Sequence, residues 1–160
     1  MLDVTVQPPA QTRPGTTLYP PVAAKLSSET GMYDELSQMW AVATLVNEDG
    51  EAVTEQPGGK TSDSAHPLDT NSTSHSSGRH STNRDQAYFY FPDLVIYTPG
   101  RYRIRVTLMR LHYSHEHPDG YAIAEDYVDS HSIVVDDGAS NNARPSKFIE
   151  LMIDNANRAR

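Results

Sequence analysis

The chain has 160 residues, the length of one ordinary domain, and its 21 acidic residues against 13 basic ones leave a net charge of -8. This acidic balance excludes a domain that coats nucleic acid by bulk attraction, because phosphate binding needs a basic face, so any DNA contact must be local. The absence of cysteine excludes disulfides, zinc fingers and thiol catalysis within this chain.

The N-terminal residues predict a short strand followed by a break. Leu2, Val4 and Val6 alternate with polar residues, and Pro8 and Pro9 end the run. Residues 22–26, which follow a second proline pair, predict a weaker strand. The N-terminus lacks a charged region followed by an apolar run, and no apolar stretch is long enough to span a bilayer, so we expect a soluble intracellular protein.

Residues 39–46 predict a strand that is buried on both sides. One face carries Trp40, Val42, Thr44 and Val46, and the other carries Met39, Ala41, Ala43 and Leu45. The turn signal at residues 47–50 ends the strand. We expect Trp40 to be a core tryptophan.

Residues 55–86 predict a flexible, disordered insertion within a single domain spanning residues 1–160. The segment contains 11 Ser or Thr residues and no Val, Ile, Met or aromatic residue, so it has little to offset the entropy lost on ordering. The parts before and after it both read as strands, and neither is able to close a core by itself.

After the insertion, residues 87–91 and 94–97 predict strand, and residues 101–108 give the clearest strand pattern in the chain. Tyr102, Ile104, Val106 and Leu108 point to one face, and Arg101, Arg103, Arg105 and Thr107 point to the other. The arginine face has two interpretations that the sequence leaves open. It is a solvated face whose arginine stems cover apolar surface, or it is a sheet face that binds a protein partner.

The polar segment at residues 112–120 predicts an exposed hairpin loop, followed by weaker strands at 121–128 and 130–135. His112, His115 and His117 with Glu116 resemble metal ligands, but no distant partner ligand is identifiable. We expect no metal site, no cofactor and no enzymatic activity, and a metal-dependent enzyme built on these histidines is the remaining alternative.

Many short strands separated by Gly and Pro turns predict an all-β, immunoglobulin-like antiparallel β-sandwich. Ser146 is a helix N-cap candidate, and Phe148, Leu151 and Met152 recur at helical spacing, so we expect one short C-terminal helix. Tyr102, two residues before Ile104, has the position of the tyrosine whose hydroxyl bonds back to the preceding turn in such sandwiches.

Several segments in this order resemble the fungal velvet-domain regulators. They are the N-terminal strand with Gln7, Pro8 and Arg13, the segment YPPVAAKL, the strand at 39–46, the block YFYFPDLVIYTPGRYRIRVTLMRL, the strand at 130–135, and the C-terminal segment RPSKFIELMIDNANRAR. The resemblance covers the chain apart from the insertion.

The resemblance implies a Rel homology-like sandwich that binds double-stranded DNA as a homodimer or as a heterodimer with another velvet protein. In that family the output is nuclear control of development, sporulation and secondary metabolism. By the resemblance, Arg13 is a phosphate-contact candidate, and Lys25, Arg158 and Arg160 would extend the same patch. Arg101, Arg103 and Arg105 are the partner-binding candidates if the arginine face of their strand binds a protein partner.

One departure from the family pattern supports a second hypothesis. Velvet proteins that bind DNA carry several Lys and Arg residues in the loop before the Pro-Pro pair, whereas QPPAQTRPGTTLYPP contains Arg13 alone. The alternative to a DNA-binding regulator is therefore an interaction module that heterodimerises with a velvet partner and contributes little DNA binding of its own.

Overall fold

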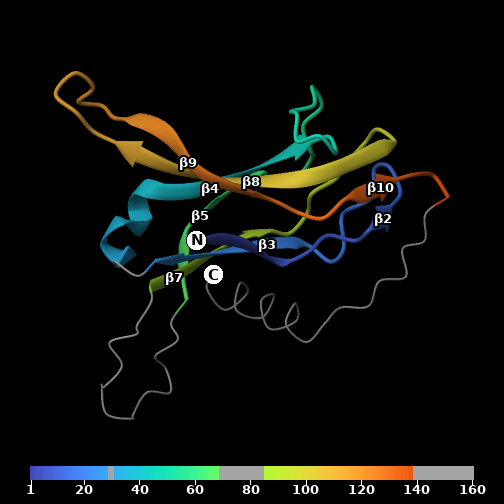
Figure 1. The fold of residues 1–160 in the computed structure, drawn as a ribbon, viewed down its shortest axis with the longest axis horizontal. Coiled ribbons are helices and arrows are strands. Elements are labelled where there is room, and N and C mark those ends of the chain that lie inside the picture. The colour runs from blue at the N-terminus through green and yellow to red at the C-terminus, as the bar shows by residue number, and fades with distance from the viewer. Residues whose placement is uncertain (29–30, 69–84, 139–160) are drawn as a thin grey trace, which may run out of the picture.

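In the computed structural model, which describes residues 1–28, 31–68 and 85–138, two β-sheets face each other (Figure 1). The elements in chain order are β1 (Leu2–Val6), β2 (Gln11–Thr12), β3 (Val22–Ser28), the 3₁₀ helix η1 (Tyr33–Gln38), β4 (Met39–Val46), β5 (Ser62–Ser64), β6 (His66–Pro67), β7 (Asp85–Phe91), β8 (Gly100–His112), β9 (Tyr121–Asp129) and β10 (Ile133–Val135). The all-β class expected from the sequence is confirmed.

One sheet has the strand order β1-β3-β7-β6, and the other has the order β2-β10-β8-β4-β5 with β9 also paired to β8. Among the described strands the pairings are antiparallel except for β2 with β10, which run parallel. The predicted strands at 2–6, 22–26, 39–46, 87–91, 101–108 and 121–128 are all confirmed, with small differences at their ends.

The core lies between the two sheets and follows the alternation of β8. Tyr102, Ile104, Val106 and Leu108 face inward and are buried, as are Phe89 and Phe91 on β7 opposite them. Removing one such side chain fully from water stabilises the fold by roughly 1.5–3 kcal/mol. Because these residues of β8 face the core, the arginines that alternate with them lie on the outer face of the six-stranded sheet.

Tyr102 makes the contact predicted for it. Its hydroxyl donates a hydrogen bond to the carbonyl of Thr98 at 3.0 Å, across the turn that starts β8. The phenol ring is buried with the core cluster. The polar end of the ring thus fixes the turn while its body packs in the core.

The expectation that Trp40 lies in the core is wrong. On β4 the buried face is that of Met39, Ala41, Ala43 and Leu45, and Trp40 is half-buried on the outer face. Both faces of this strand are apolar, so alternation alone did not distinguish the inner from the outer one. Register decides it, because Trp40 pairs with Met109 and Ala41 with the inward-facing Leu108.

The prediction of a disordered insertion is wrong for residues 55–68. Backbone pairing and the close approach of Gly59 to Asp93 hold this stretch against the rest of the fold. Gly58 pairs with Val95, and the N–H of Lys60 donates to the Asp93 carboxylate at 2.7 Å. Gly59 has φ +88°, and a Cβ there would lie 2.1 Å from the carbonyl oxygen of Asp93. Residues 69–84 of the predicted insertion lie outside the described residues.

Residues 94–97 were predicted as strand and are not one. Val95 makes isolated bridges to Thr17 and Gly58, while Leu94 and Ile96 are buried in the core. Residues 94–97 are therefore apolar because the segment is buried in the core, although it does not form a continuous strand pairing. The C-terminal helix predicted from Ser146 lies outside the described residues.

Candidate functional site

Arg105 on the outer face of β8 is held by β9. Its Nε and one terminal nitrogen donate to the two carboxylate oxygens of Asp129 at 2.7 and 2.9 Å, and its guanidinium carbon lies 4.0 Å above the ring of Tyr127. The hydrogen bonds from Arg105 to Asp129 raise the pKa of the guanidinium further. This bidentate, stacked geometry commits Arg105 to contacts within the chain.

Arg103 and Arg101 also contact groups of the same chain. Arg103 donates to the carbonyl of Ser130 at 3.1 Å, at the bend between β9 and β10. Arg101 is more exposed, with 67% of its side chain accessible, and lies 3.7 Å from a carboxylate oxygen of Glu48. Arg105 is therefore the member of the predicted partner-binding face that is closely paired with a carboxylate, and Arg101 is the member most accessible to another molecule.

Arg110 lies near the end of β8, beyond the core. Its guanidinium forms ion pairs with Glu35 on η1 and with Glu125 on β9, the latter at 2.7 Å. Burial acts to lower the pKa of Arg110, but the contacts with the two carboxylates outweigh it and raise the pKa. Arg110 thus joins η1 to the β8–β9 hairpin.

Of the predicted DNA-contact residues, the two that the structure describes, Arg13 and Lys25, are positioned by strands of different sheets. Arg13 is exposed on the loop after β2, where its carbonyl accepts the N–H of Thr16 at 3.3 Å. Lys25 is half-buried on β3 of the other sheet. In the strand register its backbone lies opposite Asp3 on β1 and Tyr88 on β7. Arg158 and Arg160 lie outside the described residues. Among the described candidates, the fold brings no basic cluster together.

A buried carboxylate that the sequence did not single out links the two sheets. Asp63 on β5 accepts hydrogen bonds from Lys60 at 3.0 Å and from the backbone N–H of Tyr90 on β7 at 2.7 Å, and its Oδ1 lies 3.1 Å from His66 Nε2. Burial acts to raise the pKa of Asp63, but the hydrogen bonds with His66, Tyr90 and Lys60 outweigh it and lower the pKa. The sequence of β5, Ser-Asp-Ser, is entirely polar and gave no sign that Asp63 would be buried.

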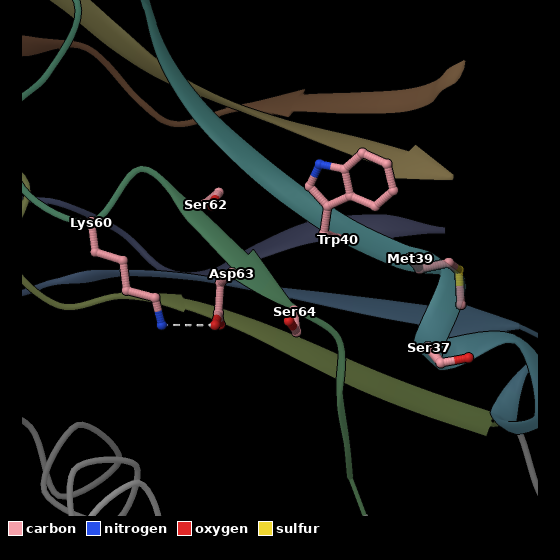
Figure 2. A pocket seen from close by; sticks show the side chains of 7 residues that line it. All are labelled: Ser37, Met39, Trp40, Lys60, Ser62, Asp63 and Ser64. Carbon is pink, nitrogen blue, oxygen red and sulfur yellow. Dashed lines mark hydrogen bonds and ion pairs between the residues drawn. The ribbon is translucent and has the colours of Figure 1, made fainter. Parts of the chain in front are cut away.

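An open hollow of ≈ 360 Å³ lies beside Asp63 and is drawn in Figure 2. It is lined by Ser37, Met39, Trp40, Lys60, Ser62, Asp63 and Ser64. Figure 2 shows the Asp63 carboxylate turned toward Lys60 and the ribbon of β7, and Trp40 on the opposite side of β4. The Asp63 carboxylate already contacts Lys60, His66 and the Tyr90 N–H. Its geometry therefore suits a structural link between the sheets and not a general base that accepts a proton from a substrate.

Two of the three histidines of the β8–β9 hairpin pack on Tyr121. His112 stacks on Tyr121 at a centroid distance of 5.9 Å and His117 meets the same ring edge-on at 5.3 Å. His112 Nε2 lies 3.5 Å from Glu125. Within residues 1–28, 31–68 and 85–138, no group of three or more His, Asp or Glu side chains is arranged to hold a metal ion.

No protein-family model matches this sequence, and a search of curated proteins finds no match either. In the part of the chain that the structure describes, no helix is long and apolar enough to cross a membrane.

Proposed function

We propose that this chain is a velvet-type regulatory domain, an immunoglobulin-like sandwich of the Rel homology type, that works by pairing with another velvet protein. Its output in this proposal is nuclear control of fungal development, sporulation and secondary metabolism. Support comes from the ordered set of sequence motifs, and from the Tyr102 bond to Thr98, which is typical of immunoglobulin-like sandwiches.

One observation favours protein pairing over direct DNA binding as the main activity. Arg105 and Arg110 each pair with a carboxylate of the same chain at 2.7 Å, which leaves two of the four arginines of the densest basic stretch less available to phosphate. A net charge of -8 adds long-range repulsion from DNA. In this proposal most of the DNA affinity of a complex comes from the partner.

Direct DNA binding through Arg13 is the second candidate. Its support is the position of Arg13, exposed on a loop that follows β2 at the edge of the six-stranded sheet. Arg101 is the second residue of β8 in the same sheet, where it lies opposite Val134 on β10. We propose no catalytic activity for either candidate.

The test is a gel shift on duplex DNA with the purified chain alone, a velvet protein alone, and the two mixed. The proposal expects a shifted species of higher affinity in the mixture, containing both chains, and weak retention with this chain alone. Tight binding by this chain alone that is lost on Arg13→Ala would replace pairing with the second candidate. Absence of any complex between the two proteins would contradict the proposal.

A further inference from the structure

The β8–β9 hairpin extends beyond the two facing sheets, as Figure 1 shows at the upper left. Exposed large apolar and aromatic side chains gather on it. Of the eight such residues among the described ones, four lie here: Tyr113, Tyr121, Ile123 and Tyr127. A concentration of this kind on one protruding element is typical of a contact surface.

The outer edge of β9 is open. β9 pairs with β8 through one edge, and no described strand pairs with its other edge. Its residues are exposed from Tyr121 to Tyr127. β9 contains neither proline nor lysine, the residues that commonly block a sheet edge against added strands. A bulge opposite Leu108 and Met109 interrupts the ladder at Glu125, which leaves residues 121–124 as a continuous open segment.

The charged residues of β9 itself are all acidic. They are Glu125, Asp126 and Asp129, and β9 contains no Lys or Arg. Arg110 and Arg105 pair with Glu125 and Asp129. The carboxylate of Asp126 is exposed and accepts only the N–H of its neighbour Tyr127 in the described contacts. An acidic strand is matched by a basic one and repelled by a copy of itself.

We infer that β9 is the docking edge for a protein partner, which adds an extended segment of alternating basic and apolar residues as a new strand. Backbone hydrogen bonds to the open edge supply part of the affinity, and the side chains beside Asp126 and Ile123 select the partner. The inference rests on the proposed pairing function and names the chemistry of its partner. It places docking on β9, next to the arginine face of β8 and not on the arginines themselves.

A nine-residue, dye-labelled peptide that alternates lysine and valine is the probe. Its binding to the whole chain is measured by fluorescence anisotropy at low salt, and its location by hydrogen exchange of the protein amides. Two peptides serve as controls, one with glutamate in place of lysine and one with proline at its centre. The lysine peptide should bind and slow exchange within residues 121–129, and both controls should fail to do so.

Matched protein variants separate strand docking from general charge attraction. Asp126→Lys and Asp49→Lys make the same change in net charge, but Asp49 lies on the turn after β4. Asp126→Lys should weaken peptide binding about fivefold and Asp49→Lys by less than about twofold, because exposed charge pairs act locally. Equal losses in the two variants, or protection outside β9, would overturn the inference.

Two further outcomes keep the inference distinct from the proposed function. If a velvet partner binds while β9 amides still exchange freely, pairing stands and the docking edge is wrong. If the peptide binds β9 and no velvet protein does, the docking edge stands and the proposed function falls. A dimer of this chain that protects β9 would overturn the basic-partner inference in favour of a second copy.

Discussion

The carboxylate of Asp63 on β5 accepts the backbone N–H of Tyr90 on β7 at 2.7 Å, and so ties the six-stranded sheet to the four-stranded one. The chain itself crosses between the sheets here, since β5 pairs with β4 while β6, two residues later, pairs with β7. Tyr90 lies beyond the end of the β6 pairing, which covers Ala87 and Tyr88. Asp63 therefore satisfies a donor on β7 that β6 does not reach.

Removing this carboxylate should destabilise the fold. Asp63→Ala leaves the Tyr90 N–H without its partner, and we expect a loss of roughly 2–3 kcal/mol in the free energy of unfolding. Asp63→Asn keeps an oxygen acceptor and should lose about half as much. Urea unfolding at neutral pH measures both, and Asp49→Ala, on an exposed turn, is the control. Equal stability of wild type and Asp63→Ala would show that the link is unimportant.

The same carboxylate predicts a pH dependence. Burial acts to raise the Asp63 pKa, but the hydrogen bonds with His66, Tyr90 and Lys60 lower it below its ordinary value of 3.8. The unfolded chain therefore binds a proton at a higher pH than the folded chain does. The stabilisation is fully present above the unfolded pKa and is lost as pH falls through the folded pKa.

Urea unfolding of wild type and Asp63→Asn across pH 7 to pH 3 tests this sign. The stability difference between them should be constant near neutrality and should narrow below the ordinary carboxyl pKa. A difference that widens on acidification would mean that the charged form is not the one favoured by folding.

Gly59 should tolerate no side chain. It has φ +88°, and an added Cβ would meet the Asp93 carbonyl at 2.1 Å, whereas Gly15 has φ +75° with nothing within 4 Å. Gly15→Ala carries only the backbone strain, of about 1 kcal/mol, and Gly59→Ala carries the clash as well, for a total of roughly 3 kcal/mol. Thermal unfolding of the two variants compares them. Equal shifts in Tm would show that residues 58–60 do not pack closely on Asp93.

The Arg105–Asp129 pair should show measurable coupling. Each side chain is 23% exposed, and the geometry is bidentate with Tyr127 stacked on the guanidinium. A double-mutant cycle with Arg105→Ala and Asp129→Ala should give a coupling of about 1 kcal/mol. The cycle through Arg101→Ala and Glu48→Ala, a longer and more exposed contact, should give a coupling near zero. Coupling of similar size in both pairs would contradict the distinction between held and accessible arginines.

Structural features that are set by the sequence of a single strand could be predicted from the sequence. Features that are set by pairing with a neighbouring strand could not. The alternation from Tyr102 to Leu108 and the Tyr102 turn contact follow from local sequence, and both are confirmed. The outward placement of Trp40 depends on its register with Met109, and burial of Asp63 depends on the approach of β7. Neither the placement of Trp40 nor the burial of Asp63 is indicated by the residues next to it in the sequence.

The same limit applies to the candidate site. The sequence shows arginines on one face of residues 101–108, but it does not show that Asp129 and Ser130 come back to meet Arg105 and Arg103. The order of residues 55–68 was missed because the stretch has few apolar residues and is held in large part by glycine geometry and backbone pairing.

The most direct test of pairing over direct DNA binding is the salt dependence of duplex DNA affinity for this chain alone. With Arg105 and Arg110 paired to carboxylates of its own chain, the chain should neutralise about two phosphates or fewer, so the plot of log K against log salt should have a slope no steeper than about -2. A slope of about -5 or steeper, reduced by Arg13→Ala, would contradict the account and establish the chain as a DNA-binding domain in its own right.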